Sequence, residues 1–313
     1  MSEGNNHSDQ AIQDFCEEDE YEFYEEEDDD DQDPNKLFEY DILQEIGQGA
    51  FAKVFLIRNR DTDTLYAAKA YSMFQLLQRR LGEEPREARF FSEVKILSTI
   101  NHKNCLKIIE LIKDDVTHKI YLIVPYAGRG PLSPKCWEAN VMDEKDAKDV
   151  FKQLAEGIQY LHNNNIVHRD IKPDNVLIQD DGNVMLCDFS VSKQLSSSDE
   201  MVDDTQGTPA FRAPEEQLTD PFDAKKSDVW SYGISLYVMI FGHLPYDIDF
   251  DNDNFIQQDI KLSQQILNTE INLERNPPIS QELKSLFQAI FVHDPKKRPS
   301  ISEVLKNDWF NST

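Results

Sequence analysis

The sequence predicts an α+β fold of two lobes, in which a small antiparallel five-stranded lobe with one main helix precedes a larger, mainly helical lobe. Strand-like alternation of apolar and polar residues prevails in the first part of the chain, and helical spacing of apolar residues prevails after Asp143. A stretch with the composition of a connector separates them. We expect an acidic tail at residues 1–36, the small lobe at 37–125, a hinge at 126–131 and the large lobe at 132–313.

The small lobe is expected to be a meander of strands with a glycine-rich first turn. Gly47 and Gly49 interrupt the first alternating stretch, and residues 61–64 have the chemistry of a turn. Apolar residues at helical spacing around residues 90–97 predict the one helix. The five strands are expected near residues 38–43, 54–57, 65–69, 108–112 and 120–124.

The large lobe is expected to begin with a helix capped by Asp143, whose side chain can accept hydrogen bonds from N–H groups of the first turn. Residues 229–241 are apolar on almost every side but too few to span a bilayer. We therefore expect them to form a helix buried in the centre of the lobe. The first helix should bury the residues that recur at helical spacing, namely Ala147, Val150, Phe151, Leu154, Ile158 and Leu161.

The formal net charge of −27 is distributed unevenly along the chain. Residues 1–36 contain 16 Asp or Glu and one Lys, a net charge of −15, which leaves −12 for the remainder. Such a run repels itself and buries little, so we expect a disordered tail. Three roles stay open for it: a docking segment for a basic partner, an autoinhibitory arm that imitates a substrate, or a solvated tail without a specific role.

The composition also argues against several classes of protein. No apolar run reaches the length of a membrane span, and the first ten residues lack the apolar stretch of a secretory signal. We therefore expect no membrane association and a cytoplasmic location, with the nucleus also open. The acidity disfavours nucleic-acid binding, which needs a cationic surface. The four cysteines form no C-x-x-C pair, which disfavours a zinc site and a disulfide framework.

Three features of the small lobe fit phosphate binding, although each is a weak signal alone. Lys69 ends the third strand and can reach phosphates, although such a lysine is more often a solvent lysine, and Glu93 on the predicted helix can orient it. Small residues between two strands let backbone N–H groups approach a phosphate, although G-x-G is also common in ordinary turns. The candidate loop comprises Ile46, Gly47, Gln48, Gly49, Ala50, Phe51, Ala52, Lys53 and Val54.

The strongest signal is the segment His168-Arg169-Asp170-Ile171-Lys172-Pro173-Asp174-Asn175, between a predicted helix and a predicted strand. It resembles the catalytic loop of protein kinases at every defining position. A hydroxyl nucleophile needs an acceptor for its proton, which fits Asp170, and the moving phosphoryl group needs positive charge, which fits Lys172. The amide oxygen of Asn175 is a hard ligand of the type that Mg²⁺ prefers.

Further segments follow in the order of the same family. Asp188-Phe189-Ser190 resembles its metal-binding D-F-G segment, with serine in place of glycine. Gly207-Thr208-Pro209-Ala210-Phe211-Arg212-Ala213-Pro214-Glu215 resembles the end of its activation segment, whose final glutamate is then expected to pair with Arg298. Ser227-Asp228-Val229-Trp230 matches the start of its central helix, so the resemblance covers residues 38–310.

The resemblance implies the bilobal protein-kinase fold and transfer of the γ-phosphoryl group of ATP to protein hydroxyls, with Mg²⁺ or Mn²⁺ as the metal. Asn175 and Asp188 are the implied metal ligands. Adenine is implied to bind in the cleft between the lobes, near Ala67, Val124 and Ala127. The phosphates are implied to bind at the glycine-rich loop and Lys69.

Two details of the resemblance concern the acceptor and its control. Lys172 and Thr208 are similar to the residues of serine/threonine kinases at these positions. Arg169 lies beside Asp170 in the sequence and can bind a phosphate on the activation segment, for which Thr205 is the best placed acceptor. Asp203 and Asp204 can also supply negative charge there without phosphorylation.

The motifs resemble most closely those of the calcium/calmodulin-dependent protein kinase kinases. The similar features are the Asp188-Phe189-Ser190 start, the Gly207-Thr208-Pro209-Ala210-Phe211 segment and the separation of 24 residues between Lys69 and Glu93. That group phosphorylates activation-loop threonines of other kinases, so other kinases are implied as substrates. Because the sequence ends at Thr313, just after the last expected helix, calmodulin binding is not expected.

Two other classes of function stay open on the sequence. A pseudokinase, a binding scaffold of the same fold, would account for Ser190 and for Ala52 at the third small position of the loop. A small-molecule kinase of another fold would need a G-x-x-x-x-G-K-[ST] loop, which the sequence lacks. Transfer of labelled phosphate to a protein distinguishes both from a protein kinase.

Overall fold

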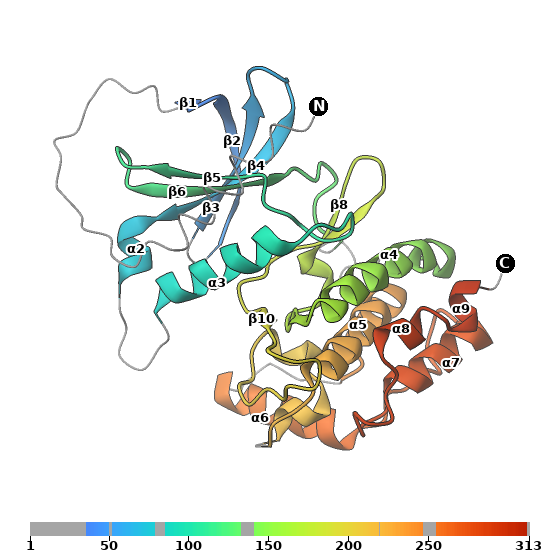
Figure 1. The fold of residues 1–313 in the computed structure, drawn as a ribbon. Helices are drawn as coiled ribbons and strands as arrows, with labels where there is room; N and C mark the ends of the chain where they lie inside the picture. Colours follow the sequence, from blue (N-terminus) through green and yellow to red (C-terminus); the bar gives the residue numbers. More distant parts are fainter. Residues whose placement is uncertain are drawn as a thin grey trace. The chain divides into compact units, whose positions relative to one another are not determined.

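The computed structural model describes residues 36–49, 52–78, 85–132, 141–218, 220–246 and 255–311. These form two compact units, which are described separately: unit 1 runs to Asn101 and includes Leu106–Gly128, and unit 2 comprises His102–Cys105 and Arg129–Thr313 (Figure 1). The tail expected at residues 1–36 lies outside the described residues except for Lys36. The hinge and lobe boundaries expected from the sequence stay predictions.

Unit 1 is built on an antiparallel sheet with the strand order β1-β2-β3-β4-β6-β5. Five strands were expected, and β1 is the addition: its two residues fold back on β2 through Phe38, whose φ is 47°. A pair this short has no alternation that a sequence pattern can reveal. The strands are β1 Lys36–Leu37, β2 Tyr40–Gln48, β3 Ala52–Asn59, β4 Leu65–Ser72, β5 Glu110–Asp114 and β6 Lys119–Pro125.

Among the described residues of unit 1, two helices accompany this sheet. The predicted main helix is α3, Arg86–Thr99, and a short helix that was not expected, α2, Met73–Leu77, continues directly from β4. Ser72 caps α2, since its side chain accepts from the backbone N–H of Gln75. The rings of Tyr71 and Phe90 pack edge to face with centroids 4.8 Å apart and so join β4 to α3.

The two faces of the sheet of unit 1 have different roles. Residues directly opposite each other in an antiparallel pair share a face. One face bears an apolar core that includes Ile57, Ala68 and Ile123. The alternate residues, among them Lys69 opposite Val54, lie on the other face. Sequence alternation in β3, β4 and β6 therefore separates the core from the candidate phosphate-binding residues.

Unit 2 is mainly helical, which confirms the α+β class together with the sheet of unit 1. Short strands form two antiparallel pairs, β8 with β9 and β7 with β10. The helices are α4 Glu144–Asn163, α5 Ala224–Phe241, α6 Phe255–Asn268, α7 Gln281–Ile290, α8 Ile301–Val304 and α9 Asp308–Asn311. The strands are β7 Ile166–Val167, β8 Val176–Ile178, β9 Val184–Leu186 and β10 Lys193–Gln194, and the 3-10 turns are η2 Pro173–Asn175, η3 Pro209–Phe211 and η4 Pro214–Gln217.

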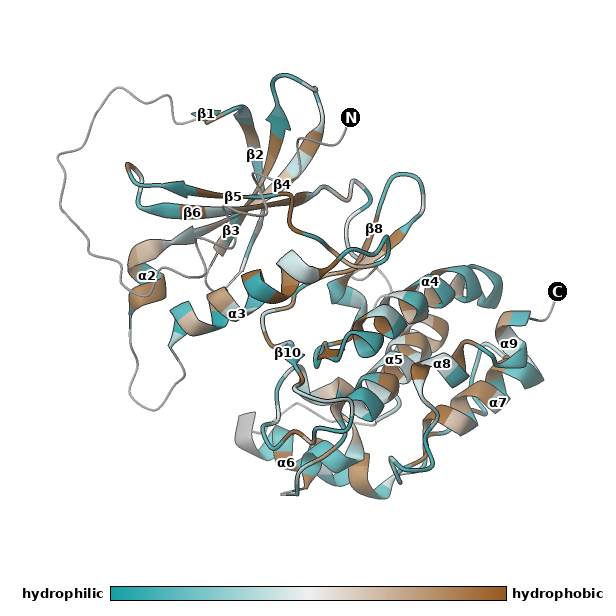
Figure 2. Ribbon diagram, viewed as in Figure 1, coloured by the Kyte–Doolittle hydropathy of each residue, from teal (hydrophilic) through white to brown (hydrophobic). Residues whose placement is uncertain are grey.

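The two principal helices of unit 2 form where the sequence predicts them. Asp143 caps α4 by accepting from the N–H of Asp146 at 2.8 Å. Polar and apolar residues alternate along α4 in Figure 2, and its apolar side is buried, except that Val150, which was expected there, is half-buried. Residues 227–241 of α5 are all buried, which confirms the expected central helix, and Gly242 ends it with a φ of 75°. None of the helices in the described ranges has the length and apolar composition needed to cross a membrane.

Candidate active site

In unit 1, β4 and α3 bring Lys69 and Glu93 together. The Lys69 Nζ donates to Glu93 Oε1 at 2.9 Å, and the hydroxyl of Tyr71 donates to the other carboxylate oxygen at 3.3 Å. Glu93 is 5% exposed, and the ammonium of Lys69 lies 5.3 Å from the centre of the Tyr71 ring. A buried carboxylate thus fixes the lysine on the face of the sheet opposite the core.

The hairpin of β2 and β3 carries the glycine-rich loop. Gly47 pairs with Val54 and Gln48 with Lys53, and the N–H of Gly49 donates to the carbonyl of Ala52 at 2.8 Å. Ile46 lies at a bulge of β2 and is exposed, and Lys53 forms a 3.0 Å ion pair with Glu45. Ala50 and Phe51, at the tip of the loop, lie outside the described residues.

The residues expected near adenine line the same face of the sheet as Lys69. Ala67 lies opposite Val124 in the β4–β6 pair, as Val54 lies opposite Lys69 in the β3–β4 pair. Ala67 and Val124 are buried, and so is Ala127, two residues after β6 ends. Small apolar side chains next to a fixed lysine fit a ligand that joins a flat apolar ring to an anionic chain, as ATP does.

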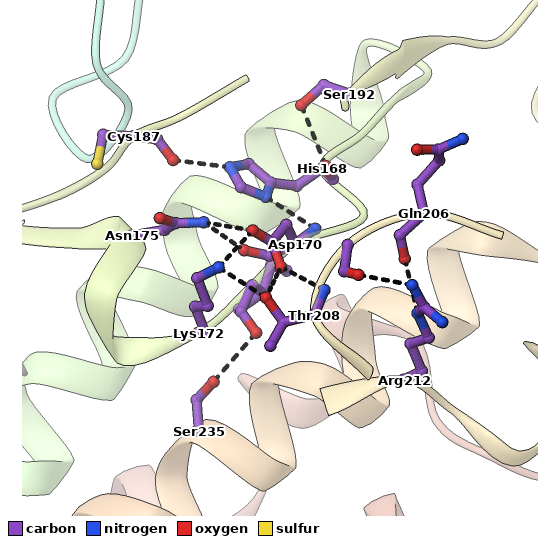
Figure 3. Close-up of polar contacts among 12 residues, drawn as sticks. His168, Asp170, Lys172, Asn175, Cys187, Ser192, Gln206, Thr208, Arg212 and Ser235 are labelled. Atoms are coloured by element: carbon purple, nitrogen blue, oxygen red, sulfur yellow. Dashed lines mark hydrogen bonds and ion pairs between the residues drawn. The ribbon is translucent and has the colours of Figure 1, made fainter. Parts of the chain in front are cut away.

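In unit 2, the carboxylate of Asp170 accepts hydrogen bonds from three side chains and one backbone group (Figure 3). Its Oδ1 accepts from the N–H of Thr208 at 2.8 Å and from the Thr208 hydroxyl at 2.7 Å. Its Oδ2 accepts from Lys172 Nζ at 2.7 Å and from Asn175 Nδ2 at 2.9 Å. Lys172 Nζ also donates to the Thr208 hydroxyl at 2.6 Å. The structure thus brings Asp170, Lys172, Asn175 and Thr208 into one cluster.

The electrostatics of this cluster keep Asp170 ionised. Burial alone would raise the pKa of Asp170, but hydrogen bonds from Lys172 and Thr208 outweigh it, so the pKa lies below its ordinary value. The side chain of Asp170 is 11% exposed, so it is not fully enclosed by the protein. An ionised, accessible carboxylate next to an ammonium group can accept a proton from a hydroxyl and support negative charge nearby.

Asp228 at the start of α5 holds the backbone of the loop that carries Asp170. Its carboxylate accepts from the N–H of His168 at 2.9 Å and from the N–H of Arg169 at 2.8 Å, and His162 Nε2 lies 2.9 Å away. Burial would raise the pKa of Asp228, but these partners, His162 first, lower it below its ordinary value. This role of Asp228 was not predicted from the sequence. The signal was an acidic residue at the start of an apolar helix, because a buried charge needs partners.

Asn175 and Asp188, the expected metal ligands, lie in neighbouring segments. The N–H of Cys187 donates to the backbone carbonyl of Asn175 at 2.8 Å. The side-chain amide of Asn175 donates to the backbone carbonyl of Asp170 at 2.8 Å and to its carboxylate, so the atom left for a metal is its Oδ1. A carboxylate and an amide oxygen are the hard donors that Mg²⁺ and Mn²⁺ take. The residues present therefore fit a divalent metal ion.

Comparison with known proteins identifies the family. The model of the protein kinase domain matches residues 40–310. A probable serine/threonine-protein kinase of Dictyostelium discoideum is 32% identical over 275 residues, which cover 87% of this chain and 38% of that protein. The chain belongs to the protein kinase family.

Two further relatives of the kinase have more specific names. CBL-interacting protein kinase 11 of Oryza sativa subsp. japonica is 32% identical over 273 residues, covering 87% of this chain and 51% of that protein. A calcium/calmodulin-dependent protein kinase kinase of Caenorhabditis elegans is 31% identical over 294 residues, which cover 88% of this chain and 53% of that protein. The latter belongs to the group that the motifs resemble. The chain thus spans about half the length of these two relatives and a smaller share of the Dictyostelium protein.

The activation segment of the kinase contacts Arg169 through Asp204. Arg169 Nη1 lies 2.9 Å from Asp204 Oδ1, and Arg169 Nε donates to the carbonyl of Val191 at 2.7 Å. Thr205, the expected phosphorylation site, instead donates its hydroxyl to the carbonyl of Glu216 at 3.2 Å. An unphosphorylated segment thus already presents a carboxylate to Arg169.

The kinase family's ion pair at the end of this segment is present. Arg298, which is fully buried, donates to both carboxylate oxygens of Glu215, at 2.5 and 2.9 Å. This confirms the pair expected from the motif. Ser190, in place of the usual glycine, does not require glycine's freedom: the left-handed residue is Asp188, with a φ of 63°, and Ser190 is outside that region.

Proposed function

We propose that this kinase transfers the γ-phosphoryl group of ATP to serine and threonine hydroxyls of proteins. The observation that carries the proposal is the cluster around Asp170, where an ionised carboxylate, the ammonium of Lys172 and the amide of Asn175 surround one accessible point. Membership of the protein kinase family supports the same reaction.

In the proposed mechanism, the acceptor hydroxyl donates a hydrogen bond to Asp170. The hydroxyl oxygen forms the new bond to phosphorus, ADP leaves, and the hydroxyl proton passes to the Asp170 carboxylate. Lys172 stabilises the negative charge on the moving phosphoryl group, and Thr208, which contacts both side chains, holds their spacing. A divalent ion held by Asn175 and Asp188 supplies neutralisation of phosphate charge when bound.

The residues of unit 1 are proposed to bind the nucleotide. Lys69, fixed by Glu93, holds phosphate oxygens, and the backbone N–H groups of the loop from Ile46 to Val54 cover them. Ala67, Val124 and Ala127 bury the adenine ring. The reaction then requires both sets of residues to act on one nucleotide.

The test is transfer of labelled γ-phosphate from ATP and Mg²⁺ to a protein substrate, followed by identification of the phosphorylated amino acids. We expect phosphoserine and phosphothreonine. Asp170→Asn should lower the turnover number by about 10²–10⁴, because it removes the proton acceptor but keeps the shape. Absence of transfer by the wild-type chain, or undiminished transfer by Asp170→Asn, contradicts the proposal.

The alternative is a pseudokinase scaffold that binds nucleotide or partners without efficient transfer. It rests on Ser190 and Ala52, of which Ser190 is compatible with the backbone that the segment adopts. ATP binding that Lys69→Met abolishes, without transfer to any protein, would favour the scaffold. A Ser190→Gly variant separates the two further, since it should create transfer only if serine is what prevents it.

The proposed substrates include other kinases. The support is the resemblance in motifs and the similarity to the nematode protein named a calcium/calmodulin-dependent protein kinase kinase. Inactive kinase domains with activation-loop threonines should be phosphorylated there, and alanine at that threonine should abolish the label. No role for calmodulin, nucleic acid or a membrane forms part of the proposal, and a cytoplasmic location stays a prediction.

A further inference from the structure

In the activation segment, the carbonyl oxygens of residues 206–209, next to Asp170, are bound by residues of the same segment. Arg212 Nε donates to the carbonyl of Gln206 at 3.0 Å, and Arg212 Nη2 donates to the carbonyl of Gly207 at 2.7 Å (Figure 3). The next two carbonyls, of Thr208 and Pro209, accept from the N–H groups of Phe211 and Arg212 at 3.0 and 3.2 Å. Four consecutive carbonyl oxygens are therefore engaged.

This segment borders the point where the acceptor hydroxyl must bind. Thr208 touches both Asp170 and Lys172, so a peptide whose hydroxyl reaches Asp170 passes along residues 206–209. Extended peptides are commonly held by hydrogen bonds to a neighbouring backbone. In antiparallel pairing, the commoner arrangement, an acceptor residue opposite Thr208 places the following residue opposite Gly207.

The conformation of Gly207 directs its carbonyl to Arg212 and is fixed by packing. Its φ is 76°, in the left-handed region that favours glycine. A Cβ atom at this position would overlap the backbone carbonyl oxygen of Arg169. Because the guanidinium binds the carbonyls of Gln206 and Gly207 together, a planar group with several donors is needed to hold both. The carbonyl of Gly207 is thereby turned to Arg212 and withheld from a substrate.

We propose that Arg212 makes this kinase prefer substrates in which proline directly follows the acceptor serine or threonine. Any other residue there brings a backbone N–H that loses its water and finds no free carbonyl opposite it. Proline has no N–H to satisfy. This inference rests on the proposed serine/threonine kinase activity, but it does not depend on whether the substrates are other kinases.

The test measures kcat/KM for a set of peptides that differ only beside one serine. The residue after it is alanine, proline or N-methylalanine, and a second set places the same residues before it. With the wild-type kinase, proline and N-methylalanine after the serine should exceed alanine by about tenfold, the cost of one unsatisfied N–H. N-Methylalanine separates the missing N–H from the shape of the proline ring. The same residues before the serine should give no such gain.

Two variants assign the preference to Arg212. Arg212→Met removes the donors, so the advantage of proline over alanine should fall severalfold, mainly because the alanine peptide improves. Lys297→Met is the matched control, since it removes one positive charge from an exposed side chain elsewhere in unit 2 and should keep the full preference. If Arg212→Met fails to fold, the comparison of alanine with N-methylalanine after the serine still tests, on the wild-type kinase, whether the missing N–H causes the preference.

Each contrary outcome has a distinct meaning. Equal kcat/KM for alanine and proline in the wild-type kinase overturns the inference, as does an undiminished proline preference in a folded Arg212→Met variant. A gain from proline without a gain from N-methylalanine also overturns it, because the missing N–H would then not be the cause. Failure to phosphorylate any peptide or protein contradicts the proposed function itself.

Discussion

Asp228 illustrates how one buried side chain positions residues that lie far from it in the sequence. It is 1% exposed, and it accepts from two backbone N–H groups of the Asp170 loop, 59 and 60 residues away. A second contact between α5 and this loop is the hydroxyl of Ser235, which donates to the carbonyl of Ile171 at 3.3 Å. The carboxylate of Asp228 therefore helps to maintain the backbone conformation of Arg169, whose φ is 67°.

Replacement of Asp228 should destabilise the protein and slow transfer together. Asp228→Ala leaves two buried N–H groups and His162 without their acceptor, which should cost about 3–5 kcal/mol in the free energy of unfolding. Asp228→Asn keeps an oxygen for one N–H and should cost less. Urea unfolding and phosphoryl-transfer assays on both variants measure whether Asp228→Ala loses more stability and activity than Asp228→Asn. An alanine variant as stable and active as wild type would contradict the assigned role.

Asp204 should contribute to activity in the unphosphorylated kinase. Its carboxylate pairs with Arg169, next to Asp170, and the hydrogen bond from Arg169 outweighs partial burial and keeps the pKa of Asp204 below its ordinary value. Asp204 is about half exposed, so the pair should be worth roughly 1 kcal/mol, and Asp204→Asn should lower kcat/KM about fivefold. Asp203→Asn, a neighbouring exposed carboxylate, is the matched control. Equal kcat/KM values for Asp204→Asn and Asp203→Asn would contradict this role of Asp204.

Phosphorylation of Thr205, whose phosphate would bind Arg169, stays a separate prediction. The Thr205 hydroxyl donates to the carbonyl of Glu216, so this hydrogen bond must break before another kinase can phosphorylate Thr205. Thr205→Ala should lower both the phosphate content and, modestly, the activity of protein purified from cells. Unchanged activity together with unchanged phosphate content would refute it.

At the scale of elements, the segment between η3 and α5 holds a carboxyl group that titrates near neutral pH. Glu216 is buried and accepts from the N–H of Ala213 at 2.9 Å and from the hydroxyl of Ser227. Burial raises the pKa of Glu216 from 4.5 to about 7, against the effect of these two donors. Between these values the folded chain keeps a proton that the unfolded chain has released, so rising pH must weaken the fold.

Glu216→Gln should remove this pH dependence. The wild-type protein should lose roughly 3 kcal/mol of unfolding free energy between about pH 4.5 and about pH 7.5 from this group, whereas glutamine keeps the hydrogen-bonding shape and does not titrate. Urea unfolding at several pH values, with the exposed Glu282→Gln as control, measures the difference between the curves. Parallel curves for wild type and Glu216→Gln would show that Glu216 does not titrate in this range.

The elements of this fold differ in how well the sequence predicts them. The helices α4 and α5 and the strands β3, β4 and β6 were expected, because each carries a long periodic pattern or a buried apolar run. The short elements β1 and α2 were not expected, because β1 has two residues and α2 has five, too few to carry such a pattern. Asp170, Lys172 and Asn175 were expected together because they belong to one short segment that resembles the kinase catalytic loop, and the contacts among these three residues are local.

Contacts at the site between residues far apart in the sequence could be predicted only where a known motif includes both partners. The Glu215–Arg298 pair was expected because the family motif names it, although 83 residues separate the partners. The contacts of Asp228 and of Arg212 depend on how loops fold back onto a helix or onto themselves. Arg212 stood in a recognised motif, yet nothing in its neighbours indicated that its guanidinium binds two carbonyl oxygens.

At the scale of the whole molecule, charge is the property that the sequence distributes most unevenly. Residues 1–35 contain 16 of the 59 acidic residues and no Lys or Arg, so a chain without them carries −11 instead of −27. A single-sign charge of this size attracts cationic peptides and repels anionic ones over distances set by salt. The segment should therefore affect encounter with substrates more than the chemistry at Asp170.

Deletion of residues 1–35 should change the salt dependence of substrate binding and leave the turnover number unchanged. In the full chain, KM for a lysine-rich peptide should rise steeply between about 0.01 M and about 1 M salt, over which the Debye length falls from about 30 Å to about 3 Å. The shortened chain should show a shallower rise, and a neutral peptide should show little change in either chain. A higher turnover number after deletion would instead favour an autoinhibitory arm. Identical salt slopes for the two chains would leave the segment without a role in attracting substrates and contradict the prediction.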